Sequence, residues 1–91
     1  MSTTAIVLMN VDTRETNRVA EEVAAIPGVS EVYSVAGNYD LVAVIRVKDN
    51  DALAGLVTDK VRGIVGVQRS QTLIAFRAYS KHDLNSLFEM D

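Results

Sequence analysis

An acidic residue stands where a turn gives way to an apolar strand. In the stretch SVAGNYDLVAVIRV, residues 34–47, the residues Gly37, Asn38, Tyr39 and Asp40 separate two apolar segments. A carboxylate at this position can accept hydrogen bonds from turn amides, or it can bind the cationic group of a small molecule. The stretch is therefore either the turn of a β-hairpin or half of a small-molecule site, and the residues alone leave both interpretations open.

Two hydroxyl side chains form a second candidate group. Ser70 and Thr72 stand two residues apart in the last apolar segment. Residues two apart in a strand point to the same face of the sheet, so both hydroxyls would serve one site. Thr is also favoured in strands for packing reasons, so an ordinary structural role stays open for the pair.

The residue types that most enzymes use are scarce in this sequence. There is no Cys and a single His, His82, which excludes thiolate chemistry and argues against a histidine-rich zinc site. No phosphate-binding glycine loop and no credible His–acid pair occur. We therefore expect neither an enzyme nor a metal or other cofactor.

Composition restricts the partners. The chain has 91 residues, which suits one domain, and it carries twelve acidic and nine basic residues for a net charge of −3. A protein that binds the phosphate backbone needs a basic stripe, so direct nucleic-acid binding is not expected. No signal peptide and no apolar segment of membrane-spanning length occur, so we expect a cytoplasmic protein without a membrane partner.

Hydrophobic periodicity divides the chain into six elements. A first helix should begin at a capping box made by Asp12 and Glu15 and end before Pro27. A second helix should begin near Asp49. Short apolar or alternating segments predict the strands, which are expected over residues 5–11, 29–35, 39–47 and 67–79.

A weak internal repeat fixes the order of these elements. The segment IPGVSEV begins at Ile26, and IVGVQRS begins 38 residues later at Ile64. Two strand–helix–strand copies give a ferredoxin-like βαββαβ fold of the α+β class. We expect a four-stranded antiparallel sheet in the order 4-1-3-2, with both helices on one face.

The face without helices must also be covered. Residues 5–9 and 41–45 are apolar without interruption, although a strand with one solvated face should alternate. We expect a second copy to cover this face, making a homodimer. The alternative is that the tail, residues 81–91, folds back from the domain of residues 1–80 with Leu84, Leu87 and Phe88.

The segments IPGVSEVYSVAGNYDLVAVIRVKD and VRGIVGVQRSQTLIAF together resemble the C-terminal effector-binding (RAM) domain of the Lrp/AsnC family. In that family a PGV…G.YDLL motif is followed, after a helix, by GV…T.T..V. The resemblance extends from Ala5 to about Tyr79. It implies a ferredoxin-like fold, dimers built sheet to sheet, rings of dimers such as octamers or decamers, and amino-acid effectors bound between dimers.

The resemblance also implies roles for the polar residues described above. Asp40 would bind the ammonium group of an amino-acid effector. Ser70, Thr72 and the amides around Gly37 and Asn38 would hold its carboxylate, with Ser70 in place of the first Thr of the family motif. Tyr39 belongs to the same motif and is included in the predicted effector site.

One departure from the family shapes the predicted function. Full-length members carry an N-terminal helix-turn-helix domain, whereas the first expected strand here begins about four residues into the sequence. We therefore expect a stand-alone sensing and oligomerisation domain that modulates transcription or metabolism indirectly. It could also assemble with a full-length Lrp/AsnC relative.

Two alternatives share this architecture. Small dimeric enzymes such as cofactor-free monooxygenases use similar folds, so the fold alone does not exclude catalysis. ACT-like regulatory subunits share the βαββαβ order and also sense amino acids. ACT sites usually rely on a Gly in the first strand–helix loop, and the loop NVDTRETN has none, which disfavours that alternative.

Overall fold

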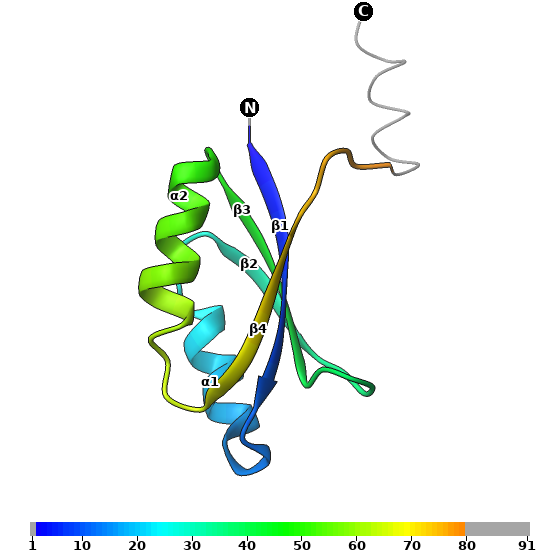
Figure 1. Cartoon of the computed structure of the whole chain (residues 1–91), viewed down its shortest axis with the longest axis vertical. Coiled ribbons are helices and arrows are strands. Elements are labelled where there is room, and N and C mark those ends of the chain that lie inside the picture. The colour runs from blue at the N-terminus through cyan, green and yellow to red at the C-terminus, as the bar shows by residue number, and fades with distance from the viewer. Residues whose placement is uncertain (1, 80–91) are drawn as a thin grey trace, which may run out of the picture.

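The computed structural model of the chain describes residues 2–79. The predicted tail of residues 81–91, with His82, Leu84, Leu87 and Phe88, lies outside the described residues. Figure 1 shows the elements in chain order, and their bounds are β1 (Thr3–Val11), η1 (Thr13–Glu15), α1 (Thr16–Ala24), β2 (Val29–Ser34), β3 (Leu41–Val47), α2 (Asn50–Gly55), η2 (Leu56–Val61) and β4 (Val67–Ile74).

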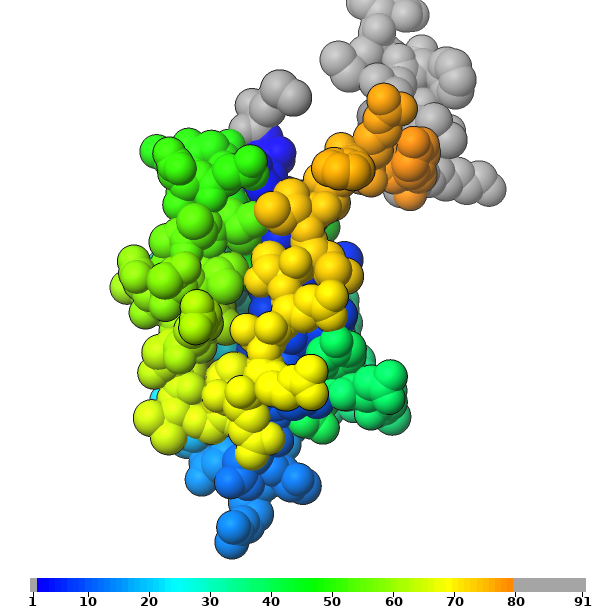
Figure 2. Space-filling view, in the orientation of Figure 1, coloured from blue at the N-terminus to red at the C-terminus, as the bar shows by residue number. Residues whose placement is uncertain are grey.

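The four strands form one antiparallel sheet in the order β2-β3-β1-β4. This is the predicted 4-1-3-2 order, and both helical segments cover the same face of the sheet (Figure 1). The ferredoxin-like prediction is confirmed. Strand β1 is central, since Ile6 pairs with Val44 of β3 on one side and with Leu73 of β4 on the other. In the space-filling view, β4 runs between the second helical segment and the loop that joins β2 to β3 (Figure 2).

Three strands are shorter than predicted, and β2 differs least, since it ends at Ser34 and not at residue 35. Strand β3 begins at Leu41 rather than Tyr39, because residues 35–40 form a loop that is closed by the bond from the Val35 N–H to the Asp40 carbonyl at 3.0 Å. This loop is wider than the tight turn expected at Gly37-Asn38. Strand β4 ends at Ile74. The last backbone bond to β1 runs from the Ala75 N–H to the Thr4 carbonyl, and β1 begins at Thr3, so it offers no partner to later residues.

The first helix begins differently from the prediction. The Asp12 carboxylate accepts a hydrogen bond from the Arg14 N–H at 3.0 Å, so Asp12 is a cap as expected. Glu15 does not complete the capping box, because its carboxylate binds the Arg18 Nε at 2.7 Å. The Asp12 N–H instead donates to the Gly66 carbonyl, and a short 3₁₀ turn, η1, precedes α1.

The second helix changes its winding halfway. Asp49 caps α2 by accepting from the Ala52 N–H at 2.8 Å, as a helix start near Asp49 predicted. The following turn, η2, is π-helical, and its last bond runs from the Arg62 N–H to the Val57 carbonyl, five residues back, at 3.0 Å. Hydrophobic spacing did not predict this change, which matters for the site described below.

The core lies between the sheet and the helices. Alternate residues of β1 and β3 point to the helices and are buried, which explains half of each apolar segment. The residues between them point to the helix-free face, where Ile6 of β1 keeps 36% of its surface exposed in the single chain. Leu73 of β4, which pairs with Ile6, keeps 43%. The buried residues are Ala5, Val7, Met9, Val11, Val19, Val23, Leu41, Ala43, Ile45, Leu53, Leu56 and Val61.

Two glycines give the sequence repeat a structural counterpart. Gly28 follows α1 with φ of 102°, and Gly66 follows η2 with φ of 107°. A β-carbon at Gly28 would lie 2.8 Å from the Leu56 Cδ1 atom, and one at Gly66 would lie 2.9 Å from the Val19 Cγ2 atom. The loop after each helix therefore packs against the other helix, and only glycine fits both the conformation and the space.

Candidate functional site

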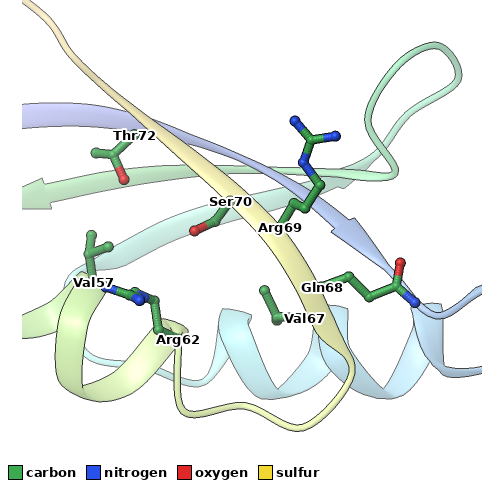
Figure 3. A pocket seen from close by; sticks show the side chains of 7 residues that line it. All are labelled: Val57, Arg62, Val67, Gln68, Arg69, Ser70 and Thr72. Atoms are coloured by element: carbon green, nitrogen blue, oxygen red, sulfur yellow. The ribbon is translucent and has the colours of Figure 1, made fainter.

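A cavity of about 490 Å³ lies between strand β4 and the end of the second helical segment (Figure 3). Its volume is in the range of small-molecule sites. We call it the β4 cavity. Most of its lining is polar, and the lining residues are Val57, Arg62, Val67, Gln68, Arg69, Ser70 and Thr72.

Strand β4 places both predicted hydroxyls in this cavity. Ser70 pairs with Met9 and Thr72 with Val7, two residues whose side chains are buried beneath the helices. Ser70 and Thr72 therefore point to the helix side of the sheet, as Figure 3 shows. Because β4 is an edge strand, their hydroxyls border an open cavity instead of the closed core.

The π-helical turn brings Arg62 to the same cavity. Val57 and Arg62 are joined by the i+5 hydrogen bond of η2, and both line the cavity. Five residues make about 1.4 turns of an α-helix, so regular winding would place the two side chains on different faces. Departures of this kind from α-helical winding are frequent at functional sites.

The hairpin loop borders a different cavity, which we call the hairpin cavity. It has a volume of about 360 Å³ and is lined by Asn10, Asn38, Tyr39 and Arg69. The Asn10 side-chain amide donates to the Asn38 carbonyl at 2.8 Å. The Tyr39 hydroxyl is 2.7 Å from the Gln71 Oε1 atom on β4, so the loop is fixed to the neighbouring strands.

Gly37 and Asp40 line neither of these cavities. Gly37 has φ of 133° and faces open space, which is the conformational role of a turn glycine. The Asp40 Oδ2 atom accepts a hydrogen bond from the Val11 N–H at 2.9 Å. Asp40 therefore has a structural role in the single chain, because it closes the hairpin end of the sheet.

One chain does not unite the predicted effector residues. Figure 3 shows Ser70 and Thr72 on one side of β4, whereas Arg69 points to the other side, toward the hairpin. Arg69 borders both cavities. The hydroxyl pair and the hairpin loop thus form two separate half-sites, with strand β4 between them (Figure 2).

Sequence reasoning missed the two cationic residues. Neither Arg62 nor Arg69 was among the predicted effector residues. Within residues 2–79, neither guanidinium forms an ion pair. The sequence did offer a signal for Arg69. It is next to Ser70 in the last strand, and successive side chains of a strand point to opposite faces, so Arg69 could be expected on the face opposite the hydroxyls. No signal was available for Arg62, since its placement depends on the π turn.

The groups with shifted pKa values lie outside both cavities. The hydrogen bond from Arg18 to Glu15 raises the pKa of Arg18, helped by the charges of Glu15 and Glu22 and opposed by burial. The hydrogen bond to the Glu31 carboxylate raises the pKa of the Tyr33 hydroxyl. Both shifts belong to local structural contacts.

Residues 2–79 contain no group of three His, Asp or Glu side chains that could hold a metal ion. In the same part of the chain, no helix is both long and apolar enough to cross a membrane.

The sequence matches a known domain family over nearly its whole length. The family model described as the Lrp/AsnC ligand binding domain matches residues 4–84. A curated relative, the uncharacterized HTH-type transcriptional regulator PH1916 of Pyrococcus horikoshii, is 40% identical over 79 residues, which are 84% of this chain and 53% of the relative. The chain therefore spans about half the length of the curated relatives it matches.

Solved structures agree with this match. TTHA0845 from Thermus thermophilus has a TM-score of 0.82 and 44% identity, over 87% of this chain and 99% of that one. The regulator NMB0573 of Neisseria meningitidis, in a complex with L-Met, has a TM-score of 0.77 and 19% identity, over 86% of this chain and 52% of that one. At 19% identity this second likeness concerns the fold alone. The domain match and the identity to these relatives show that the chain belongs to the Lrp/AsnC family and contains its ligand-binding domain.

Proposed function

We propose that this chain is a sensing and oligomerisation domain that binds a small effector, an amino acid, between dimers. In this role it modulates transcription or metabolism indirectly. One observation carries the proposal. This chain matches the Lrp/AsnC ligand binding domain, and the hydroxyls of Ser70 and Thr72 line its β4 cavity. The relatives are named as transcriptional regulators, and one solved neighbour is a complex with an amino acid.

The chemistry of the two half-sites suits the two ends of an amino acid. A carboxylate needs hydrogen-bond donors, which Ser70, Thr72 and the amides around Gly37 and Asn38 can supply. An ammonium needs an acceptor, and the Asp40 Oδ1 atom accepts no hydrogen bond from residues 2–79. Since β4 separates these groups within one chain, we propose that the β4 cavity of one copy meets the hairpin loop of another.

The helix-free face supports assembly. Its centre is apolar, formed by Ile6, Leu8, Val42, Val44 and Leu73. Covering such a band with a second copy removes apolar surface from water, at about 25 cal/mol for each Å². We propose a dimer through this face, with dimers joined further into an octamer or decamer.

The net charge suits an indirect role. At −3, a chain with scattered basic residues has no basic stripe for the phosphate backbone. We propose that the chain acts in the cytoplasm through its effector and through other proteins, including mixed assemblies with a full-length Lrp/AsnC relative, and not through direct contact with DNA.

A ligand screen with a mass readout tests this function. The melting temperature and the light-scattering mass of the full chain are measured with each standard amino acid in turn. An effector present at about 100 times its Kd should stabilise the assembly by about 2.7 kcal/mol, which is a visible shift in melting temperature. If no amino acid changes either quantity, the proposed function is wrong.

A pair of threonine variants locates the site. Thr72→Val keeps the shape and strand propensity but removes a hydroxyl from the β4 cavity, so it should weaken effector binding about tenfold and leave the fold intact. Thr58→Val is the matched control, because Thr58 is exposed on η2 and lines neither the β4 cavity nor the hairpin cavity. Equal affinity in both variants would place the effector elsewhere.

A further inference from the structure

The β4 cavity has a one-sided charge. Among residues 2–79, its only charged lining residues are Arg62 and Arg69, and the Arg69 side chain points across β4 toward the hairpin cavity, which it also lines. The neutral polar residues of the lining are Gln68, Ser70 and Thr72. No carboxylate lines the β4 cavity or the hairpin cavity beside it, as far as residues 2–79 define them. This local excess of positive charge runs against the net charge of −3 of the whole chain.

Neither guanidinium is engaged by another side chain of the described part of the molecule. Within residues 2–79, the ion pairs involve Arg14 and Arg18, and neither Arg62 nor Arg69 takes part in one. The same residues make no side-chain hydrogen bond to Arg62 or Arg69. A guanidinium presents a planar fork of donors that fits a carboxylate with two parallel bonds.

The placement of Arg62 depends on a local departure from regular structure. The π turn that ends at Arg62 joins it to Val57 and carries both residues to the cavity. Figure 3 shows Arg62 on the helix side of β4, the side that Ser70 and Thr72 also face. The hydroxyl pair and a guanidinium therefore border one space, which can take two anionic groups of a single ligand.

Charge disfavours a neutral amino acid held only in this cavity. Its ammonium would lie near the Arg62 guanidinium and would find no carboxylate in the lining that residues 2–79 provide. A ligand with two carboxylates gains a charge-assisted bond for each, one at the hydroxyls and one at the Arg62 guanidinium.

We infer that the β4 cavity selects small ligands that carry two carboxylates over neutral amino acids. This inference rests on the proposed function and names the charge class of its effector. Two kinds of ligand carry two carboxylates, an acidic amino acid and a dicarboxylate without an ammonium. Only the first would also use Asp40 of a neighbouring copy.

Calorimetry on the assembled full chain tests the selection, with L-glutamate, L-glutamine and glutarate as probes at one fixed ionic strength. L-glutamate should bind at least about tenfold more tightly than L-glutamine, which has the same shape without the second charge. Tight binding of glutamate alone identifies an acidic amino acid. Equally tight binding of glutarate identifies a dicarboxylate without an ammonium. Both results support the selection of two carboxylates.

Variants assign the selection to the cavity. Arg62→Gln should weaken binding of the favoured dicarboxylate about tenfold and leave L-glutamine binding unchanged. Arg14→Gln is the matched control, because the Arg14 side chain is 92% exposed and lines neither the β4 cavity nor the hairpin cavity. It should bind like the unmodified chain.

Three outcomes overturn the inference. They are equal affinity for L-glutamate and L-glutamine, unchanged dicarboxylate affinity in both Arg62→Gln and Arg69→Gln, and displacement of the ligand by sulfate at the same ionic strength, which would indicate an unselective anion site. If neutral amino acids bind and dicarboxylates do not, the inference fails and the proposed function stands. If no amino acid binds, the proposed function fails as well.

Discussion

The carboxylate of Asp40 accepts a hydrogen bond from the backbone N–H of Val11 at 2.9 Å. The pairing of β1 with β3 ends at Met9 and Leu41, and the Asp40 N–H still donates to the Met9 carbonyl. The Val11 N–H lies just beyond that last pair and beside the irregularity in the pairing of β1 with β4. The side chain of Asp40 thus supplies the acceptor that a longer β3 would have offered.

Two substitutions separate the structural role of Asp40 from its proposed role as an ammonium acceptor. Asp40→Ala should lower the free energy of unfolding by about 1–3 kcal/mol, because the part-buried Val11 N–H loses its partner. Asp40→Asn keeps an acceptor oxygen and should cost less. Thermal unfolding measures both, at about 4–8 °C for each kcal/mol in a domain of this size.

Effector binding by the same two variants completes the comparison. If Asp40 binds an ammonium, Asp40→Asn should weaken binding about tenfold while it stays close to normal stability, because it removes the charge. A variant that melts earlier but binds the effector normally would restrict Asp40 to its contact with Val11.

Glycine substitutions should report the packing between each helix and the opposite loop. Gly66→Ala should destabilise by about 2–4 kcal/mol, because the new methyl group meets Val19 at 2.9 Å and φ is 107°. Gly37→Ala also sits at positive φ but meets no atom within 4 Å, so it should cost only about 1 kcal/mol. Denaturant unfolding should rank the two variants in this order, and equal costs would contradict the packing argument.

The fold was predictable because its signals are local and repeated. The segments IPGVSEV and IVGVQRS, 38 residues apart, each follow one of two equivalent helices. Their glycines, Gly28 and Gly66, adopt similar positive φ values in the structure. The unbroken apolar segments of β1 and β3 correctly indicated strands with two apolar faces, although only one face packs against helices in the chain. These inferences need only periodicity and turn chemistry.

The site was less predictable because it depends on relationships between distant elements. Ser70 and Thr72 were expected on one face and do line one cavity, since the two-residue period of a strand is robust. Arg62 could not be placed, because the π turn that joins it to Val57 leaves no mark in the hydrophobic spacing. The capping box at Glu15 failed because Arg18, three residues later, is a stronger partner than a backbone N–H.

The Tyr33 hydroxyl should ionise at a higher pH than an ordinary tyrosine. Its hydroxyl donates to the Glu31 carboxylate, and this bond raises the pKa of Tyr33, while the nearby Arg46 acts in the opposite direction. A raised pKa in the folded state stabilises the fold below the usual tyrosine pKa of about 10, and this contribution is lost as the pH rises through the folded value. Phenolate absorbance of the chain minus that of Tyr33→Phe isolates this titration, and Glu31→Gln should move it to lower pH.

The helix-free face provides the test of dimerisation. Val44 lies near its centre, paired with Ile6 of β1 and adjacent to β2, and its side chain points away from the helices. In a dimer, Val44→Asp would bury an unpaired charge, at a cost of several kcal/mol. The variant should therefore lose the interface, and light scattering should report a monomer or an unfolded chain at concentrations where the unmodified chain is dimeric or larger.

A matched charge on the other side of the molecule makes this result specific. Thr58→Asp adds the same charge at an exposed position of η2, so it should leave the mass and the melting temperature of the assembly nearly unchanged. If the unmodified chain is already a well-folded monomer at micromolar concentration, the dimer prediction is wrong. Val44→Asp then distinguishes two cases. It should behave like Thr58→Asp if water reaches the apolar band, and it should destabilise the monomer if another segment of the chain packs on that band, because a charge is tolerated in water and not beneath a packed segment.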